Sequence, residues 1–381
     1  MTAPRKITTK KQVKLIFAGG FLGSGKTTAL AAIARKLIQR GKKVGIITND
    51  QSENLVDTVI VKQMLDELGV PVEEVVKGCF CCKFDELIDH MEKILVHEPD
   101  VLLGEPVGSC TDFVAAVANP IKIHYKDAFR FAPFTTLVDP DKVRELMLGE
   151  TATTFPEEVS YLFMKQLEEA DLIVLNKIDL LEDDEISRLT GILEKKFSGK
   201  KVMAVSAREG RGMDQWLEVL LSGRPGANTV LRQIDYDRYA RAEAALGWLN
   251  SAIKVSASEG FDADEFLKRL AEIIRNAFQQ KNAEIGHLKF VITSAGKAMW
   301  ANVTHLAAEP VISGEQLGNL LKGTLILNAR VRLEPDELEK IVRESLSKVF
   351  KEANIRYKIE ELQCFSPAYP EPPYLIRDSV N

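Results

Sequence analysis

The chain has 381 residues with 50 basic and 55 acidic side chains, which gives a net charge of −5. This balance offers no electrostatic basis for nucleic acid as the main partner, and no apolar run is long enough to cross a membrane. The length suggests two domains. Five cysteines, three of them within four positions, indicate a reducing cytoplasm in which thiols serve metal or redox chemistry. Residues 1–11 are basic and polar, so we expect a flexible tail and not a signal peptide.

The first predicted elements surround a glycine-rich segment. An apolar strand at residues 13–18 leads into GGFLGSGKTT at residues 19–28, and a helix is predicted at residues 29–40. The segment fits G-x-x-x-x-G-K-T, in which glycines let backbone N–H groups converge on phosphate oxygens. Lys26 supplies charge to the outer phosphates, and the Thr27 hydroxyl is a ligand for Mg²⁺. The predicted phosphate-binding residues are Gly20, Gly23, Ser24, Gly25, Lys26, Thr27 and Thr28.

An acidic loop, NDQSENLVD at residues 49–57, follows a short predicted strand at residues 44–48. In proteins with this phosphate-binding pattern, the loop after the next strand often reaches back to Mg²⁺ and the γ-phosphate. The alternative is an acidic loop that is only solvated. A helix at residues 58–68 and a strand at residues 72–76 are predicted next.

Three cysteines come after that strand, in the sequence Gly78-Cys79-Phe80-Cys81-Cys82. On a straight strand Cys79 and Cys81 would share one face and Cys82 would oppose them, so the chain must turn to bring the sulfurs together. Gly78 permits that turn. Three thiolates suit Zn²⁺, Cu⁺ and related ions and leave a fourth position open. The alternatives are buried apolar cysteines and a redox pair formed by Cys79 and Cys82.

A predicted helix at residues 84–96 and a short strand at residues 101–103 lead into GEPVGSC at residues 104–110. We expect Glu105, at the end of a buried strand, to sense the γ-phosphate through Mg²⁺ or water. Cys110 lies beside this segment, and His124 follows in what we predict to be a loop. Whether either of them completes the metal site stays open at this point.

The second nucleotide motif is Asn176-Lys177-Ile178-Asp179, which follows an apolar strand. A carboxylate in the plane of guanine accepts hydrogen bonds from the ring N–H and from the exocyclic amine, whereas adenine presents the reverse pattern. N-K-x-D at the end of a strand downstream of a phosphate loop therefore predicts GTP; a chance loop is the alternative. The predicted base-binding residues are Asn176, Lys177, Asp179, Ser206 and Ala207.

These elements predict an α/β fold with a mostly parallel sheet and helices on both faces over residues 12–222. Residues 223–233 read as a linker. Residues 234–381 are expected to form a smaller α+β domain of split βαβ type, with an insertion near residues 307–322. The other predicted strands are 134–138, 171–175, 201–205, 244–256, 288–293, 298–304, 325–333 and 355–362, and the other helices are 156–169, 213–221, 263–280 and 334–353. The proline- and aromatic-rich residues 366–374 should pack as irregular chain against a neighbouring part.

Together these motifs resemble the CobW-like P-loop GTPases, relatives of the nickel chaperones of urease and hydrogenase. The resemblance rests on GGFLGSGKTT, NDQSENLVD, GCFCC, EPVG and NKID, and it covers most of the chain. It implies a GTP-hydrolysing protein that delivers a metal or metallocofactor through a C-terminal client-binding domain. By position, Mg²⁺ would be bound by Thr27 and Asp50. Zn²⁺ or another thiophilic metal would be bound by Cys79, Cys81 and Cys82, and the catalytic residues would be Lys26, Asp50 and Glu105.

The predicted function is GTP hydrolysis coupled to delivery of a metal or metallocofactor to a client metalloenzyme or corrinoid protein. No general base is evident, so turnover should be slow until a client or a nucleotide-dependent homodimer completes the site. A chaperone for a cobalamin-dependent enzyme and a thiol redox switch with bound GTP are the alternatives. A small-molecule kinase is a further one, against which NKID argues.

Overall fold

The first part of the chain forms a parallel sheet in the computed structural model, which describes residues 7–49, 56–65, 68–223, 226–378 and 380. Its strands are β1 (Val13–Gly19), β2 (Val44–Asn49), β3 (Val72–Val75), β4 (Val101–Glu105), β5 (Phe129–Phe131), β6 (Thr135–Val138), β7 (Leu172–Leu175) and β8 (Lys201–Ala204). The order is β3-β2-β4-β1-β6-β7-β8, and β5 also pairs with β1. Every residue of β1, β2 and β4 is buried, because parallel strands are covered on both faces.

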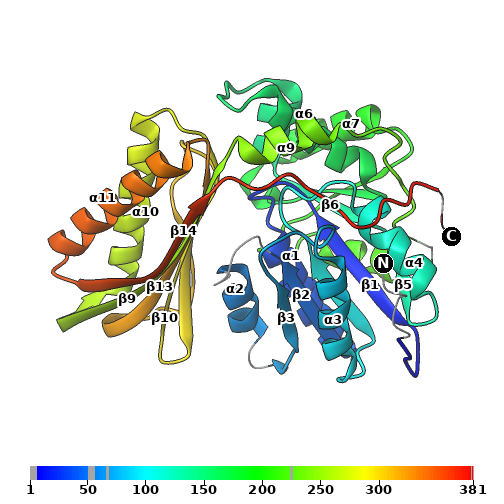
Figure 1. Cartoon of the computed structure of the whole chain (residues 1–381), viewed down its shortest axis with the longest axis horizontal. Coiled ribbons are helices and arrows are strands. Elements are labelled where there is room, and N and C mark those ends of the chain that lie inside the picture. Colours follow the sequence, from blue (N-terminus) through cyan, green and yellow to red (C-terminus); the bar gives the residue numbers. More distant parts are fainter. Residues whose placement is uncertain (1–6, 50–55, 66–67, 224–225, 379, 381) are drawn as a thin grey trace.

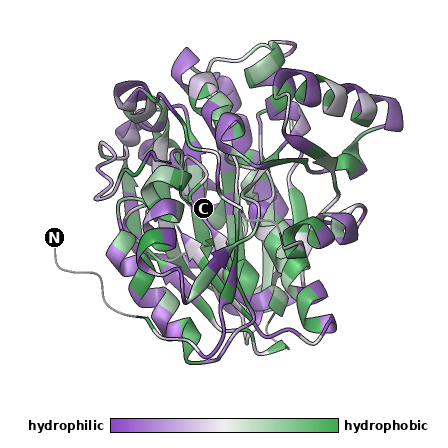
Figure 2. Ribbon diagram, turned by 90° about the vertical axis from the view of Figure 1, so that its right-hand side faces the viewer, coloured by the Kyte–Doolittle hydropathy of each residue, from purple (hydrophilic) through white to green (hydrophobic). Residues whose placement is uncertain are grey.

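Helices cover both faces of this sheet, as Figure 1 shows. They are α1 (Lys26–Gln39), α2 (Val56–Leu65), α3 (Phe84–Leu95), η2 (Val114–Ala118), α4 (Asn119–His124), α5 (Pro140–Lys142), η3 (Val143–Leu148), α6 (Glu157–Glu169), η4 (Ile178–Leu180), α7 (Asp183–Lys196), α8 (Met213–Leu221) and α9 (Tyr236–Ala244). One core cluster joins β1 to α1 and α8, and another joins it to α3, η2 and α6. Figure 2 shows hydrophobic strands in the middle and helices of mixed polarity around them.

The carboxyl ends of the parallel strands lie along one edge of the sheet, which is where such sheets bind ligands. The glycine loop follows β1, and Asn49 and Glu105 end β2 and β4. Asp139 and Asn176 come directly after β6 and β7. This edge therefore gathers the predicted nucleotide motifs.

The second part of the chain forms an antiparallel sheet. Its strands are β9 (Gly247–Asp262), β10 (Ile285–Ser294), β11 (Lys297–Val303), β12 (Val311–Gly314), β13 (Asn319–Val331) and β14 (Arg356–Phe365), in the order β12-β11-β10-β13-β9-β14. Helices α10 (Ala263–Gln280) and α11 (Pro335–Glu352) pack on one face of this sheet (Figure 1). The four strands β10, β13, β9 and β14 with these two helices are the predicted split βαβ arrangement. Strands β11 and β12 come between β10 and β13 in the sequence, and in the sheet they extend its edge beyond β10.

Helix α2 packs on the other face of the second sheet. Along β10, Leu288 and Phe290 point into the core formed with α10 and α11, so Lys289 and Val291 point the other way. Val291 contacts α2 in a small cluster whose members are Val56, Ile60, Val291, Ala298 and Ile326. The C-terminal sheet is thus held against the helix that follows the acidic loop.

Several helices were not predicted from the sequence. Helix α7 is largely charged, with only Ile186, Leu189 and Leu193 buried. Helix α9 begins after Asp235, whose side chain accepts hydrogen bonds from the backbone N–H groups of two following residues. The strand predicted from residue 244 begins instead at Gly247, after this helix. The prediction that His124 lies in a loop is wrong, because it is the last residue of α4.

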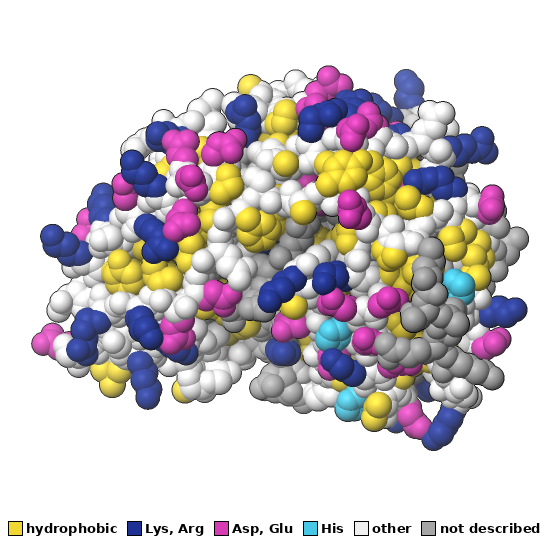
Figure 3. Space-filling view, viewed as in Figure 1, with side chains coloured by type: hydrophobic (Ala, Val, Ile, Leu, Met, Phe, Trp, Pro, Cys, Tyr) yellow, Lys and Arg dark blue, Asp and Glu magenta, His cyan; other side chains and the backbone are white. Residues whose placement is uncertain are grey.

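The surface carries no field of a single sign on the face drawn in Figure 3, where basic and acidic side chains are interspersed. This pattern agrees with the small net charge of −5. In the part of the chain that the structure describes, no helix has both the length and the apolarity needed to span a bilayer.

Glu169, at the end of α6, provides a test of the buried electrostatics. Its Oε1 accepts a hydrogen bond of 2.6 Å from the backbone N–H of Val114. Burial, with the charge of Asp112, raises the pKa of Glu169 from 4.5 to about 8. The folded chain therefore binds this proton more tightly than the unfolded chain. The resulting stabilisation is complete below about pH 4.5 and is lost as the pH rises through about 8.

We expect Glu169→Gln to flatten the fall in the free energy of unfolding over this pH range, measured by denaturant titration at several pH values. A pH slope equal to that of the unmodified chain would show that Glu169 is already ionised in the fold.

Candidate nucleotide and metal sites

The loop between β1 and α1 has a backbone conformation that favours glycine. Gly20, Gly23 and Gly25 have φ angles of +133°, +78° and +84°. A Cβ on Gly20 would stand 2.2 Å from the carbonyl oxygen of Leu137, and one on Gly25 would stand 2.5 Å from Nδ2 of Asn176. These positions therefore require glycine, and the loop leads into the N-terminus of α1, where backbone N–H groups suit phosphate.

Two side chains of the first turn of α1 face this loop. Nζ of Lys26 donates to the carbonyl oxygens of Gly20 and Phe21, at 2.8 and 3.3 Å. The Thr27 hydroxyl lies 2.9 Å from a carboxylate oxygen of Asp57 and 2.9 Å from one of Glu105. Oxygen ligands of this kind suit Mg²⁺. Of the other two predicted loop residues, Ser24 is buried and Thr28 is half-buried.

The two carboxylates beside Thr27 differ in their protonation. Burial, with the neighbouring charge of Asp57, raises the pKa of Glu105 to about 7. Burial would also raise the pKa of Asp57, but the ammonium of Lys289 holds that pKa below its ordinary value. Asp57 was not singled out in the sequence, although it belongs to the acidic loop. The predicted ligand Asp50 lies outside the described residues.

The predicted base-binding residues lie together after β7 and β8. Nδ2 of Asn176 donates to the carbonyl oxygen of Ser24 at 2.9 Å, and Oδ1 of Asn176 accepts from the N–H of Ala207 at 3.0 Å. The Ser206 hydroxyl donates to Asp179 at 2.6 Å. Asn176 thus joins the phosphate loop to the loops that follow β7 and β8. The Asp179 carboxylate is held by the Ser206 hydroxyl.

Lys177 also has a partner that the sequence analysis did not identify. Its ammonium pairs with Asp139 at 2.5 Å, and its backbone has a φ of +62°. Asp139 follows β6 at the same sheet edge, and this position was the one signal that could have identified it.

The three clustered cysteines occupy a turn between β3 and α3. Sγ of Cys79 lies 2.6 Å from Sγ of Cys81, which lies 3.9 Å from Sγ of Cys82. The turn is closed by hydrogen bonds from the backbone N–H groups of Cys82 and Lys83 to the carbonyl oxygen of Cys79. Among the described residues, these cysteines are the group whose ligand atoms could together hold a metal ion. The predicted convergence of the three sulfurs is therefore confirmed.

The cysteine loop is fastened to the end of β2 by Asn49. The Asn49 amide donates to the carbonyl oxygens of Gly78 at 2.7 Å and Val75 at 3.0 Å. Its Oδ1 accepts from the backbone N–H of Phe80 at 2.9 Å. Asn49, the first residue of the acidic loop, is thus hydrogen-bonded to the residues on both sides of Cys79.

The thiols differ in proton affinity. Hydrogen bonds from the thiols of Cys79 and Cys81 lower the pKa of Cys82 to about 3, whereas a hydrogen bond with Cys81 and burial raise the pKa of Cys79. One thiolate with two adjacent thiols is a favourable starting point for a thiophilic cation, which displaces the remaining protons.

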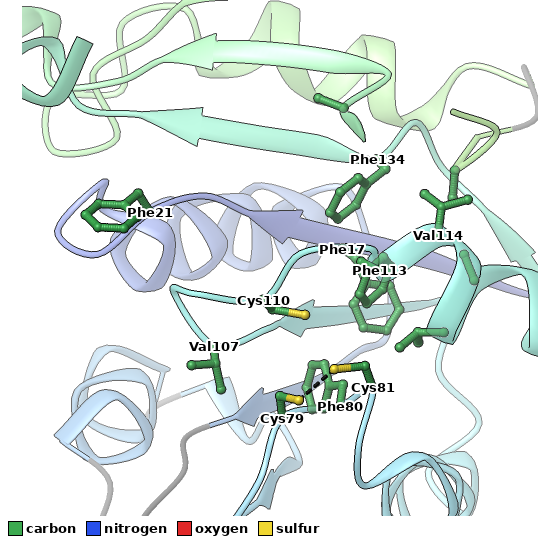
Figure 4. Close-up of a cluster of buried hydrophobic side chains, with 14 of the residues drawn as sticks. Phe17, Phe21, Cys79, Phe80, Cys81, Val107, Cys110, Phe113, Val114 and Phe134 are labelled. Atoms are coloured by element: carbon green, nitrogen blue, oxygen red, sulfur yellow. Dashed lines mark hydrogen bonds between the residues drawn. The ribbon is translucent and has the colours of Figure 1, made fainter. Parts of the chain in front are cut away.

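Of the two candidates for a fourth ligand, Cys110 is close and His124 is not placed for it. The buried Cys110 thiol is near enough to Cys81 to raise the pKa of that thiol, and Figure 4 shows the sulfurs of Cys79, Cys81 and Cys110 turned toward one another. Its sulfur is not among the ligand atoms that lie within 4.8 Å of one another. The His124 ring packs instead near Tyr125 and Tyr374, with centroid distances of 6.3 and 5.9 Å.

The C-terminal segment after β14 lies across the cysteine loop. The backbone of Glu371 lies close enough to Cys82 to help lower the pKa of that thiol, and the ring of Tyr374 packs on Phe84 at 4.9 Å. Further along, the Arg377 guanidinium pairs with the fully buried carboxylate of Asp112 at 2.6 Å. The predicted irregular packing of this segment is confirmed, and its neighbour is the first domain, as Figure 1 shows.

The fold, the glycine loop, the N-K-x-D loop and the cysteine cluster define a P-loop nucleotide-binding protein with a thiol-rich site. A family model described as the CobW/HypB/UreG nucleotide-binding domain matches residues 14–204. The chain belongs to this family.

Curated relatives carry related names. A zinc chaperone CobW from Sinorhizobium sp. is 30% identical over 209 residues, which cover 50% of this chain and 58% of that protein. A zinc-regulated GTPase metalloprotein activator 1 from Dictyostelium discoideum is 25% identical over 215 residues, which cover 50% of this chain and 45% of that protein. The chain thus spans about half the length of these relatives.

Solved structures match over longer stretches but more distantly. Zn(II)-bound YjiA GTPase from E. coli aligns with 89% of this chain and 99% of its own, at 14% identity and a TM-score of 0.34. Nickel-bound HypB from Helicobacter pylori aligns with 59% of this chain and 93% of its own, at 17% identity and a TM-score of 0.37. Because both TM-scores are low, the family assignment rests on the sequence match.

The guanine assignment can be tested at Asp179. Asp179→Asn should weaken GTP binding by about ten-fold or more, because it removes a charge-assisted hydrogen bond worth roughly 1.5–3 kcal/mol. It should strengthen binding of xanthosine triphosphate, whose exocyclic oxygen accepts where guanine donates. The measurement is an equilibrium titration with both nucleotides, and Asp184→Asn, at an exposed position of α7, is the control. Equal competition by ATP and GTP in the unmodified chain would contradict the assignment.

The cover over the cysteines can be tested at Arg377. Arg377→Ala should loosen the C-terminal segment and increase the rate at which a thiol reagent labels Cys82, followed by mass spectrometry. Tyr374→Ala, which removes the ring contact with Phe84 and leaves Asp112 paired, should act in the same direction. Labelling of Cys82 at the unmodified rate in both variants would show that the segment does not shield the thiol.

Proposed function

We propose that this chain binds and hydrolyses GTP and couples its nucleotide state to the binding and delivery of a thiophilic metal ion to a client protein. The glycine loop with Lys26 would hold the phosphates. Thr27, Asp57 and Glu105 would hold Mg²⁺, which would supply positive charge to offset that of the phosphates. Asp179 and Ser206 would hold the guanine.

The observation that carries this proposal is the position of Asn49. It is the last residue of β2 and the first of the acidic loop, and the last residue of that loop, Asp57, lies beside Thr27. Its side chain also makes three hydrogen bonds to the segment from Val75 to Phe80. The hydroxyls of Thr48 and Thr58 lie 2.7 Å apart and join the end of β2 to the start of α2, so a shift of Asp57 with the nucleotide would reach Asn49 and the cysteines.

The chemistry of the sulfurs supports a metal ion as the cargo. Cys79, Cys81 and Cys82 have ligand atoms within 4.8 Å of one another, and thiolates prefer Zn²⁺ and Cu⁺ over hard cations. Zn²⁺ is the favoured ion, since relatives are named for zinc. All five cysteines are free, which supports a reducing compartment such as the cytoplasm.

A client would receive the metal from the side of the C-terminal segment. Cys82 is the most exposed of the three sulfur residues, and Glu371 lies against it. We propose that a metalloprotein client displaces this segment during transfer; a corrinoid-dependent protein is the alternative client.

The coupling can be measured by competition for Zn²⁺ with a chelating dye, in the presence of GDP and of a non-hydrolysable GTP analogue. We expect the two affinities to differ by about 5- to 150-fold, the usual range for coupled sites. Asn49→Ala should bring the two affinities together, because it removes the hydrogen bonds between the end of β2 and the cysteine loop. Asn276→Ala, at an exposed position of α10, is the matched control.

Cys81→Ser should abolish Zn²⁺ binding in both states. Equal Zn²⁺ affinities in the two states of the unmodified chain would contradict the coupling. Absence of Zn²⁺ binding, together with a readily formed disulfide between Cys79 and Cys82, would favour a thiol redox switch instead.

A further inference from the structure

The C-terminal sheet packs directly against the phosphate loop. A Cβ on Gly23 would stand 3.2 Å from the methyl carbon of Thr304 and 3.5 Å from the carbonyl oxygen of Gly286. A Cβ on Gly286 would in turn stand 2.8 Å from a methyl carbon of Leu22. The start of β10 and the end of β11 therefore form a wall over the outer side of the glycine loop.

Lys289 on β10 extends from this wall to the predicted Mg²⁺ ligands. Its ammonium pairs with Oδ1 of Asp57 at 2.6 Å, and the same oxygen lies 2.9 Å from the Thr27 hydroxyl. The side chains of Lys289 and Asp57 are each only 16% exposed. The ammonium is also close enough to Lys26 to lower the pKa of that residue, beyond the larger effect of burial. A second lysine thus reaches the site from a distant part of the sequence.

Lys289 lies in a row of amides on the same sheet face. The antiparallel registers pair Lys289 with Asn302 on β11 and with Asn328 on β13, and they pair Asn328 with Asn250 on β9. Directly paired residues share a face, so this row lies on the sheet face that packs against α2, as Val291 does one pleat further along.

The amides of this row are buried and have unused hydrogen-bonding atoms. Asn328 and Asn250 are 1% and 4% exposed. Oδ1 of Asn302, Oδ1 of Asn328 and both amide atoms of Asn250 have no hydrogen-bond partner among the described residues. Buried polar atoms are normally paired, so the unpaired amide oxygens of Asn302 and Asn328, which flank Lys289 in the sheet, favour a polar ligand beside it.

Mg²⁺ and the Lys289 ammonium would compete for the same carboxylate. A divalent cation at Thr27 would draw Asp57 into its ligand shell, and Lys289 would then lack its anionic partner in a buried position, which is costly. The nearest new anion would be the outermost phosphate. Cations supplied to this position from a separate structural element are a recurring device in phosphoryl transfer.

We propose that the C-terminal domain completes the nucleotide site, with Lys289 binding the terminal phosphate of Mg–GTP and the adjacent asparagine row holding the ammonium and the phosphate-bound water. GDP has no γ-phosphate to offer as a new partner, so Lys289 keeps its ion pair with Asp57 in the GDP state. The inference rests on the nucleotide site proposed above, and it makes Lys289 the residue by which the C-terminal domain distinguishes the two nucleotides.

The test compares affinities for fluorescent GTP and GDP analogues, with Mg²⁺ present, in Lys289→Gln, Lys289→Arg and the unmodified chain. Lys289→Gln should weaken the non-hydrolysable GTP analogue by about ten-fold, the usual effect of losing one charge-assisted hydrogen bond, and GDP by less than about two-fold. Lys289→Arg should restore most of the difference. Lys322→Gln, on β13 of the same sheet and at an exposed position, is the control and should change neither affinity.

A second variant separates phosphate binding from simple attachment of the domains. Asn302→Leu leaves the ion pair of Lys289 with Asp57 intact and should still weaken the GTP analogue selectively. Equal weakening of GTP and GDP by Lys289→Gln, with no effect of Asn302→Leu, would show that Lys289 only attaches the domains and would overturn the proposal. Unchanged affinities in every variant would overturn it as well. If the unmodified chain binds neither nucleotide, the proposed nucleotide site itself is wrong.

Discussion

The Thr27 hydroxyl joins three parts of the molecule. It lies at equal distance from Asp57 at the start of α2 and from Glu105 at the end of β4, and Asp57 is held in turn by Lys289 from the second sheet. These side chains are far apart in the sequence, so their meeting depends on the correct packing of both sheets and of α2 between them. The position of the C-terminal domain is thereby tied to the first turn of α1, where phosphates would bind.

The charges at this junction are balanced within a buried volume. Two ammonium groups, Lys26 and Lys289, face two carboxyl groups, Asp57 and Glu105. Each charge alone would be costly to bury, and burial, with the charge of Asp57, raises the pKa of Glu105 to about 7. A divalent ion between the two carboxyl groups would offset their repulsion, so this arrangement favours the charge that it is proposed to receive.

The cysteine site depends on a different contact, the amide of Asn49. Three hydrogen bonds from one side chain hold the turn that brings the sulfurs together. The C-terminal segment then covers the turn through Tyr374 and Arg377. The cysteine turn is therefore contacted from two sides, by the end of β2 and by the last residues of the second domain.

Local features could be read directly from the sequence. The glycine loop, the N-K-x-D loop and the cysteine turn each depend on a few consecutive residues, because φ angles, hydrogen-bonding groups and sulfur atoms there act on their neighbours. Helix α10 was predicted at residues 263–280 and is confirmed, since its apolar residues repeat with the helical period. Helices α7 and α9 were missed because their surfaces are mostly charged and only a few of their residues are buried.

The sequence alone was therefore sufficient for the fold class, the glycine loop, the position of the N-K-x-D loop and the convergence of three thiols. Only the tertiary structure brings Asp57 to Thr27 and Lys289 to Asp57, because the alternation of β10 indicates which way Lys289 points but not what lies opposite it. The same holds for Arg377, whose partner Asp112 is buried in the other domain. Such pairs are fixed by the packing of separate elements, and no short-range pattern in the sequence indicates which side chains will meet.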